Sequence, residues 1–159
     1  ALTDVVIMAS TGRIFVTGPD VVRSVTGENV DMERLGGVDT HARRSGVVHV
    51  AADNEADAFA RARKVVDLLA NQGGVAKHVE DADLAALLPA SPKRAYDVHP
   101  VVEGLLDDDT WLELHGRWAP NITTGWGRLA GRTVGVIANN PLRLGGCLDS
   151  ASSGRMCAA

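Results

Sequence analysis

Short runs of apolar residues, separated by turn-forming residues, mark the first third of the chain. Three such runs, at 5–8, 14–16 and 47–51, have the length of buried strands in a layered α/β core. Between the second and third runs, Pro19 at a first helical position and Gly27 as a stop predict a short helix. The pattern therefore predicts an α/β fold.

The segment 54–70 carries the clearest helical pattern. Asp53 or Asn54 can accept hydrogen bonds from the free amides of its first turn, and Gly73-Gly74 ends it. Apolar residues recur on one face at helical spacing: Ala58, Ala62, Val65 and Leu69, with Phe59 and Val66 widening the stripe. The basic residues, Arg61, Arg63 and Lys64, fall mainly on the other side. A solvated face is favoured for them over a contact with the phosphate group of a ligand.

Residues 121–141 form two strand-like runs around a tight polar turn. The turn falls at Ala130-Gly131 and the second run covers 132–138, which predicts a β-hairpin. A dinucleotide-binding loop does not fit, because such a loop lies between a strand and a helix N-terminus. Upstream, the sequence predicts a short helix at 98–106 and then a strand, from 111 to 118, that leads into the hairpin.

Two prolines within four positions interrupt the pattern between residues 89 and 94. Pro89 and Pro92 block both helix continuation and ladder pairing, so this segment is the candidate linker.

No group of residues has the spacing of a metal site. Asp107, Asp108 and Asp109 are adjacent and point in different directions on a loop, so a solvated turn is favoured over a magnesium site. The histidines are scattered, at His41, His49, His78, His99 and His115, and we expect His49 to face away from its strand's core. Cys147 is expected to be a buried free thiol and Cys157 an exposed one. The sequence predicts no bound metal.

The composition and charge of the chain argue against several classes of protein but indicate no particular function. The 159 residues are 45% hydrophobic and 23% charged, which suits one domain or parts of two. A net charge of −4 argues against a nucleic-acid-binding protein, which usually carries a basic surplus. No apolar run approaches the ~20 residues that span a bilayer, and residues 1–20 lack the pattern of a secretory signal. The sequence predicts a cytoplasmic protein.

The hairpin region and the residues that follow it, 142–149, resemble the carboxyltransferase (β) subunit of biotin-dependent acyl-CoA carboxylases. Acetyl- and propionyl-CoA carboxylases are the nearest members of that family. Further blocks of resemblance follow in family order at 1–4, 15–22, 25–28, 35–37, 45–47, 95–98 and 112–114. The resemblance covers about residues 1–152, and such an ordered set is more specific than any single motif.

The resemblance implies a crotonase-like α/β fold built from ββα units. Residues 1–88 would be the C-terminal part of a first carboxyltransferase domain, and residues 95–159 the N-terminal part of a second. It also implies the reaction, in which a carboxyl group passes from carboxybiotin to the α-carbon of acetyl-CoA or propionyl-CoA. The biotin is carried by a partner protein that bears biotin carboxylase and biotin-carrier domains, and the parent enzyme is a homo-oligomer.

Glycine-rich turns carry this chemistry, because their backbone amides stabilise the charge that develops on oxygen. The two oxyanion segments of the family lie outside residues 1–159, so we expect no catalytic residue in this chain and no activity from the chain alone. Gly145 and Gly146 are the one glycine pair in a comparable position. They are expected either to line the biotin-side pocket or to form a tight turn that requires positive φ.

Family members are several times longer than this chain, so we expect it to be an internal fragment. From Ser152 onward the tail departs from the family pattern. Two other functions stay open. One is a non-catalytic remnant that only mediates assembly or has no role; the other is a biotin-dependent acyl-CoA decarboxylase subunit of the same superfamily.

Overall fold

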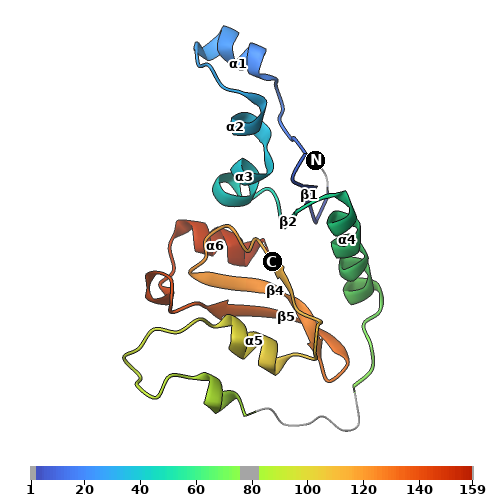
Figure 1. Ribbon diagram of the computed structural model, residues 1–159, viewed down its shortest axis with the longest axis vertical. Helices are drawn as coiled ribbons and strands as arrows, with labels where there is room; N and C mark the ends of the chain where they lie inside the picture. Colours follow the sequence, from blue (N-terminus) through green and yellow to red (C-terminus); the bar gives the residue numbers. More distant parts are fainter. Residues whose placement is uncertain (1–2, 76–82, 159) are drawn as a thin grey trace. The chain divides into compact units, whose positions relative to one another are not determined.

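The computed structural model describes residues 3–75 and 83–158, and the chain divides into two compact units, residues 1–62 and 63–159 (Figure 1). Because His78 falls between the described ranges, the prediction that it binds no metal lies outside them. The two units are taken in turn.

The first unit has a small parallel sheet and three α-helices. Strand β1 (Ile7–Ala9) pairs with β2 (Val50–Ala52), so two of the three predicted strands are present, each shifted by about two residues. The helices are α1 (Pro19–Thr26), α2 (Met32–Gly36) and α3 (Val38–Thr40), and α3 continues into the π-helical turn η1 (His41–Ser45). Met8, Val38, Ala42 and Val48 form the buried core.

The predicted helix after Pro19 is confirmed, and the predicted strand at 14–16 is wrong. Gly27, at φ 76°, ends α1 by donating its N–H to the carbonyl of Arg23. Ile14 instead lies in a loop, where its N–H donates to Gly36 O and its carbonyl contacts His41 Nε2. Val16 is fully exposed. An apolar run of three residues becomes a strand only where a partner strand is available, and here α2 and η1 take its place.

Helix α4 (Glu55–Ala70) confirms the clearest helical prediction and corrects its face. Asn54 Oδ1 accepts the N–H of Asp57, so Asn54 is the N-cap. Val65 and Leu68 are the buried positions, whereas three residues of the predicted stripe, Phe59, Val66 and Leu69, are exposed. The helix is therefore rotated toward Leu68, which the sequence did not single out.

Two of the three basic residues of α4 are less solvated than predicted, whereas Arg63 is exposed as predicted. Arg61 is half-buried and bonds to the carboxylate of Asp57 through Nε at 2.9 Å. Lys64 lies on the side of Val65 and Leu68, and its ammonium donates to the carbonyls of Asp109 and Trp111 at 2.7 and 2.9 Å. Long side chains on the edge of a buried stripe can bury their stems and still satisfy their charged ends.

The second unit contains an antiparallel sheet in the order β3-β4-β5. Strand β3 (Leu112–Leu114) pairs with β4 (Ile122–Leu129), which forms a hairpin with β5 (Arg132–Asn139). Ala130 and Gly131, at φ 53° and 82°, make the two-residue turn, so the predicted hairpin corner is confirmed. Both turn residues have the left-handed conformation that matches the twist of the strands.

Helices pack against this sheet. Helix α5 (His99–Leu105), close to the predicted 98–106, lies beside β5 in Figure 1. Val102 of this helix and its two cap residues, Val98 and Leu106, pack against Val134, Val136 and Ala138 of β5 and against Trp111. Helix α6 (Ser150–Cys157) packs against β4 and begins with a capping box of Asp149 and Ser152. Two 3₁₀ turns, η2 (Leu84–Leu87) and η3 (Leu144–Gly146), complete the unit.

The second half of α4 belongs to this unit and is bonded to the sheet. Thr133 donates through Oγ1 to Leu68 O at 2.8 Å, and Arg128 reaches the Asp67 carboxylate at 2.9 Å. The candidate linker at 89–94 contains a turn and bends but no helix or strand, and residues 90–94 are exposed, whereas Pro89 is half-buried. The domain boundary there stays a prediction.

Candidate functional site

The glycine pair singled out in the sequence lies in η3, directly after β5. Leu144, Gly145 and Gly146 have φ values of 48°, 64° and 71°, so three successive residues take the left-handed conformation. Gly146 is buried and Gly145 is exposed. A Cβ on Gly146 would lie 3.2 Å from the Cβ of Asn139, whereas a Cβ on Gly145 would meet nothing within 4 Å. Both glycines therefore have the positive φ that favours glycine. Only at Gly146 does the neighbouring chain also come so close that a side chain would crowd it.

Asparagine side chains hold this turn in place. Asn139 Nδ2 donates to Gly146 O at 2.5 Å, and Asn121 Nδ2 donates to Cys147 O at 2.7 Å. The N–H of Gly146 donates to Arg143 O at 2.8 Å. Cys147 is exposed rather than buried as predicted, because the turn holds its carbonyl inward and leaves the thiol in solvent. Cys157 is exposed as predicted.

Asn140 connects the turn to a group of ionisable side chains. Its N–H donates to Asn121 O at 2.9 Å, and its Nδ2 donates to Asp97 Oδ1 at 3.2 Å. Asp97 in turn bonds to His99 Nδ1 at 2.5 Å through the same oxygen. Asn140, directly after β5, is thus bonded to Asp97, two residues before the start of α5.

His99 lies between two carboxylates. Its Nε2 is 3.3 Å from Glu113 Oε1 and 3.4 Å from Thr123 Oγ1. Burial by itself lowers the pKa of His99, but the hydrogen bond to Asp97 and the negative charge of Glu113 outweigh it and raise that pKa above its ordinary value. Burial acts to raise the pKa of Asp97, and the bonds from His99 outweigh it and lower that pKa. The pair therefore favours a protonated imidazole.

Arg155 closes this network from α6. Its side chain is fully buried, and Nη2 donates to Glu113 Oε1 at 2.8 Å and to Leu114 O at 2.6 Å. Nη1 donates to Trp118 O at 2.8 Å and Nε to Thr124 Oγ1 at 3.2 Å. Burial lowers the pKa of Arg155, although the Glu113 carboxylate opposes this. We call Asp97, His99, Glu113 and Arg155 the Arg155 network; of the four, only Arg155 is buried.

The sequence did not predict the Arg155 network. His99 and Glu113 are 14 residues apart, and Glu113 and Arg155 are 42 apart. Such separations have no spacing rule, and Arg155 lies in the tail where the family pattern was lost. The one available signal was the alternation Leu112-Glu113-Leu114, which places a carboxylate on the opposite face from two buried leucines.

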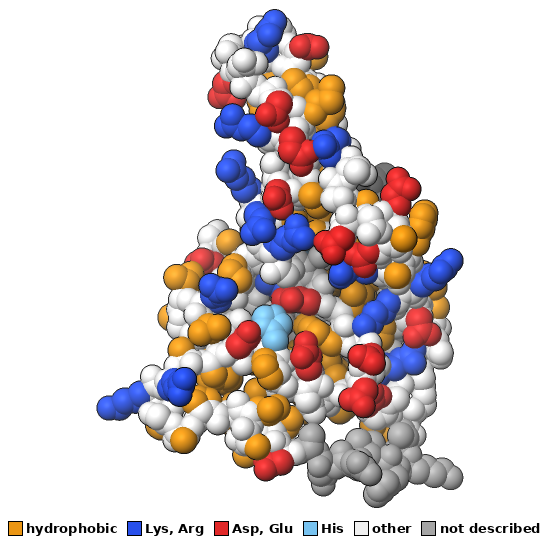
Figure 2. Space-filling view, in the orientation of Figure 1, with side chains coloured by type: hydrophobic (Ala, Val, Ile, Leu, Met, Phe, Trp, Pro, Cys, Tyr) orange, Lys and Arg blue, Asp and Glu red, His pale blue; other side chains and the backbone are white. Residues whose placement is uncertain are grey.

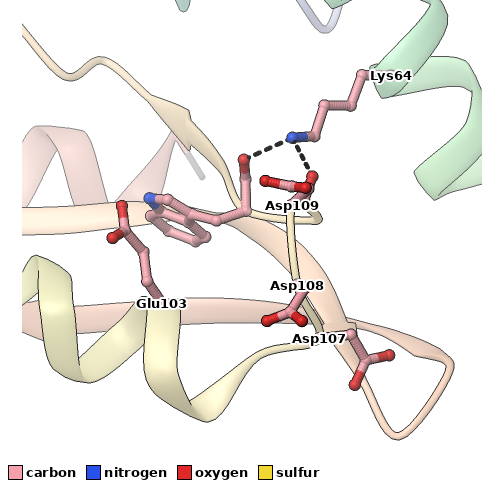
Figure 3. Close-up of a pocket in the computed structure, with 6 residues that line it drawn as sticks. Lys64, Glu103, Asp107, Asp108 and Asp109 are labelled. Atoms are coloured by element: carbon pink, nitrogen blue, oxygen red, sulfur yellow. Dashed lines mark hydrogen bonds between the residues drawn. The ribbon is translucent and has the colours of Figure 1, made fainter.

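The second unit has a small cavity of about 340 Å³ (Figure 3). It is lined by the three aspartates at 107–109 and by Lys64, Glu103 and Trp111. Asp107 is not a solvated residue as predicted, because its carboxylate accepts the N–H groups of Ala130 and Gly131 at 2.9 and 2.7 Å. Its carboxylate thus fixes the hairpin corner. Asp108 is exposed, as predicted for this turn.

Acidic side chains gather on the face of α5 and the loop after it in the view of Figure 2. Within residues 3–75 and 83–158, no group of three or more His, Cys, Asp or Glu side chains has a metal-binding arrangement. No helix among the described residues is long and apolar enough to span a membrane.

Known proteins of one family match this chain over its whole length. Residues 1–159 match the family described as the carboxyl transferase domain. The propionyl-CoA carboxylase beta chain of Rhodococcus erythropolis is 61% identical over 160 residues, which cover 96% of this chain and 33% of that protein. The biotin-dependent acetyl-/propionyl-coenzyme A carboxylase beta6 subunit of Mycobacterium tuberculosis is 58% identical, with the same coverage. The chain spans about a third of the length of these relatives.

The same assignment comes from solved structures. A transcarboxylase 12S hexamer with methylmalonyl-coenzyme A and methylmalonic acid bound matches with a TM-score of 0.88 at 33% identity, over 99% of this chain and 32% of that chain. A single-chain, multi-domain long-chain acyl-CoA carboxylase matches with a TM-score of 0.79 at 28% identity, over 95% of this chain and 15% of that chain. The expected crotonase-like α/β fold is confirmed by these neighbours. On the family match and these relatives together, the chain belongs to the carboxyl transferase domain family.

Proposed function

We propose that this chain is part of an acyl-CoA carboxylase carboxyltransferase subunit, which moves a carboxyl group from carboxybiotin to the α-carbon of acetyl-CoA or propionyl-CoA. The observation that carries the proposal is the 61% identity to a propionyl-CoA carboxylase beta chain across 96% of this chain. Identity of that extent supports a shared reaction as well as a shared fold.

We further propose that η3 lines the side of the site that receives biotin. Gly145 supports this, because a Cβ there would meet nothing within 4 Å and the residue is exposed. The neighbouring side chains of Leu142, Leu144 and Leu148 are also exposed. An open main chain flanked by apolar side chains suits a ligand with an apolar ring and a polar ureido group.

The part this turn would play is the donation of a main-chain hydrogen bond. Amides aimed at an oxygen that gains negative charge stabilise the transition state without a titrating side chain. The N–H of Gly146 is already bonded to Arg143 O, so the donor would be the N–H of Gly145 or Leu144. When bound, biotin supplies the carboxyl group. The residues of η3 would orient its ureido oxygen.

The remaining features of the parent enzyme are part of the same proposal. The biotin would be carried by a partner with biotin carboxylase and biotin-carrier domains, and the subunit would act in a cytoplasmic homo-oligomer. The hexamer named for the transcarboxylase 12S relative supports the oligomer. The domain pieces 1–88 and 95–159 are proposed as parts of two carboxyltransferase domains.

A chimera tests this function. Residues 1–159 would replace the matching third of a propionyl-CoA carboxylase beta chain, and carboxylation of propionyl-CoA would be measured with its biotin-bearing partner. We expect turnover within tenfold of the parent enzyme. A folded but inactive chimera would favour the non-catalytic remnant, and decarboxylation without forward carboxylation would favour the decarboxylase.

A matched pair of glycine variants locates the turn in the reaction. In the chimera, Gly145→Ala should lower turnover at least tenfold, because a methyl group at an open left-handed position displaces the ligand and strains the turn. Gly27→Ala is the control, since Gly27 also has positive φ and open space but ends α1 in the first unit. Equal losses of activity in the two variants would show that η3 has no special part.

A further inference from the structure

The buried side chain of Asn121, directly before β4, is bonded to the chain that follows η3. The residue is 1% exposed, and its main-chain carbonyl accepts the N–H of Asn140 at 2.9 Å. Its Nδ2 donates to Cys147 O at 2.7 Å. The pKa of Asp149 is lowered mainly by hydrogen bonds from Ser152, and a hydrogen bond from the Asn121 side chain adds to this effect. Asn121 therefore ties the base of the hairpin to the end of the glycine turn.

The two partners of the Asn121 side chain determine which way its amide faces. Both Cys147 O and the Asp149 carboxylate are acceptors, so only the amide nitrogen can face them, because the amide oxygen has no proton to donate. Asn121→Asp would keep the shape of the side chain and lose both donors. The hydrogen-bond donors at this position, rather than the size of the side chain, thus hold Cys147 O in place.

The hold on Cys147 reaches Gly145 through one further hydrogen bond. The N–H of Cys147 donates to Leu144 O at 3.2 Å. Leu144 O and the N–H of Gly145 belong to one planar peptide unit, and in a trans peptide these two groups point in opposite directions. Because Leu144 O is directed toward Cys147, the N–H of Gly145 is directed away from it.

Burial makes this chain of contacts rigid. The Asn121 amide is enclosed by residues of this chain, so water does not compete for its bond to Cys147 O. Loss of the donor would leave that carbonyl unpaired on the buried side, and the turn would have to move to satisfy it. The direction of the Gly145 N–H therefore depends on a residue that precedes it by 24 positions.

We propose that Asn121 is a positioning residue for carboxyl transfer, which aims the N–H of Gly145 at the ureido oxygen of biotin. This inference rests on the proposed function of η3. The N–H would stabilise the negative charge left on that oxygen when the carboxyl group leaves and the bonding electron pair stays on the ureido group. An amide that is already aimed before the charge develops needs no reorganisation during the reaction. Asn121 acts through Cys147 and Leu144 and does not itself contact biotin.

The test compares free biotin with 2-iminobiotin, in which an imino group replaces the ureido oxygen. Both serve as inhibitors of carboxyl transfer in the propionyl-CoA carboxylase chimera. The native chimera should bind biotin about tenfold more tightly than 2-iminobiotin, as a ratio of inhibition constants. Asn121→Asp and the neutral Asn121→Leu should each reduce this ratio about threefold or more. A ratio of two constants does not depend on the fraction of folded enzyme, so a purely structural role of Asn121 leaves it unchanged.

The matched control is Asn71→Asp, which places the same charge on an exposed residue directly after α4 and should keep the native ratio. Asn121→Leu excludes attraction between the new carboxylate and the iminobiotin cation, and if one Asn121 variant does not fold, the other decides. A native ratio near 1, or a native ratio retained at Asn121, would overturn the inference while the active chimera upholds the proposed function. A folded native chimera without activity would overturn both.

Discussion

Arg155 Nη2 donates to Glu113 Oε1 at 2.8 Å from a guanidinium that is fully buried. The same guanidinium also bonds the carbonyls of Leu114 and Trp118. It therefore ties α6 to the end of β3 and to the loop after it. A buried charge with this many partners is costly to disturb, because its removal leaves several groups unpaired.

Arg155→Met should destabilise the second unit strongly. Truncation leaves the Leu114 and Trp118 carbonyls without their donor, and we expect the free energy of unfolding to fall by about 3–5 kcal/mol in urea titrations. Arg143→Met is the matched control, since Arg143 is exposed, and should change it by less than about 0.5 kcal/mol. Similar effects of the two variants would mean that the buried arginine contributes little.

Protonation of His99 should stabilise the fold. Its pKa is raised in the folded chain, so the contribution is fully present below the ordinary value of 6.5 and is lost as the pH rises through the folded pKa. The difference in unfolding free energy between the native chain and His99→Gln should therefore shrink from pH 5.5 to pH 8.5. The pKa of His49 is lowered by burial and has the opposite pH dependence. His49 is present in both the native chain and His99→Gln, so its contribution cancels in the difference between their unfolding free energies. A difference that grows with pH would contradict the assignment.

Asp107 should matter for stability and its neighbour Asp108 should not. Asp107 accepts two main-chain N–H groups at the hairpin corner, so Asp107→Ala should cost about 2 kcal/mol by thermal or urea unfolding. Asp108 is exposed, and Asp108→Ala should stay within about 0.5 kcal/mol. If both variants behave alike, the three aspartates are the solvated turn that the sequence predicted.

Cleavage in the proposed linker should not separate the two halves of the chain. Trypsin should cut after the exposed Lys93 and Arg94. The nicked halves should still co-elute on size exclusion, because Lys64, Asp67 and Leu68 bond to residues 109–133. The same digest in urea, which should release both pieces, is the control. Separate elution without denaturant would support independent domains at 1–88 and 95–159.

Local features of the chain could be predicted from the sequence alone because they depend on a few neighbouring residues. Pro19 and Gly27 set the ends of α1, Asn54 caps α4, and Ala130-Gly131 makes the hairpin corner. Each acts through its own backbone conformation or through an amide within three residues. The ordered resemblance along the chain likewise needed only sequence, and it led to the family.

Tertiary structure decided which of these local possibilities were used. The run at 14–16 has strand composition but no partner strand. Helix α4 buries Leu68 instead of Leu69, because the sheet on which it packs determines which face of the helix turns inward. The bonds of Glu113 to His99 and Arg155 join residues far apart in sequence. Whether a charged residue is buried depends on what folds over it, and that is a property of the assembled layers rather than of any segment.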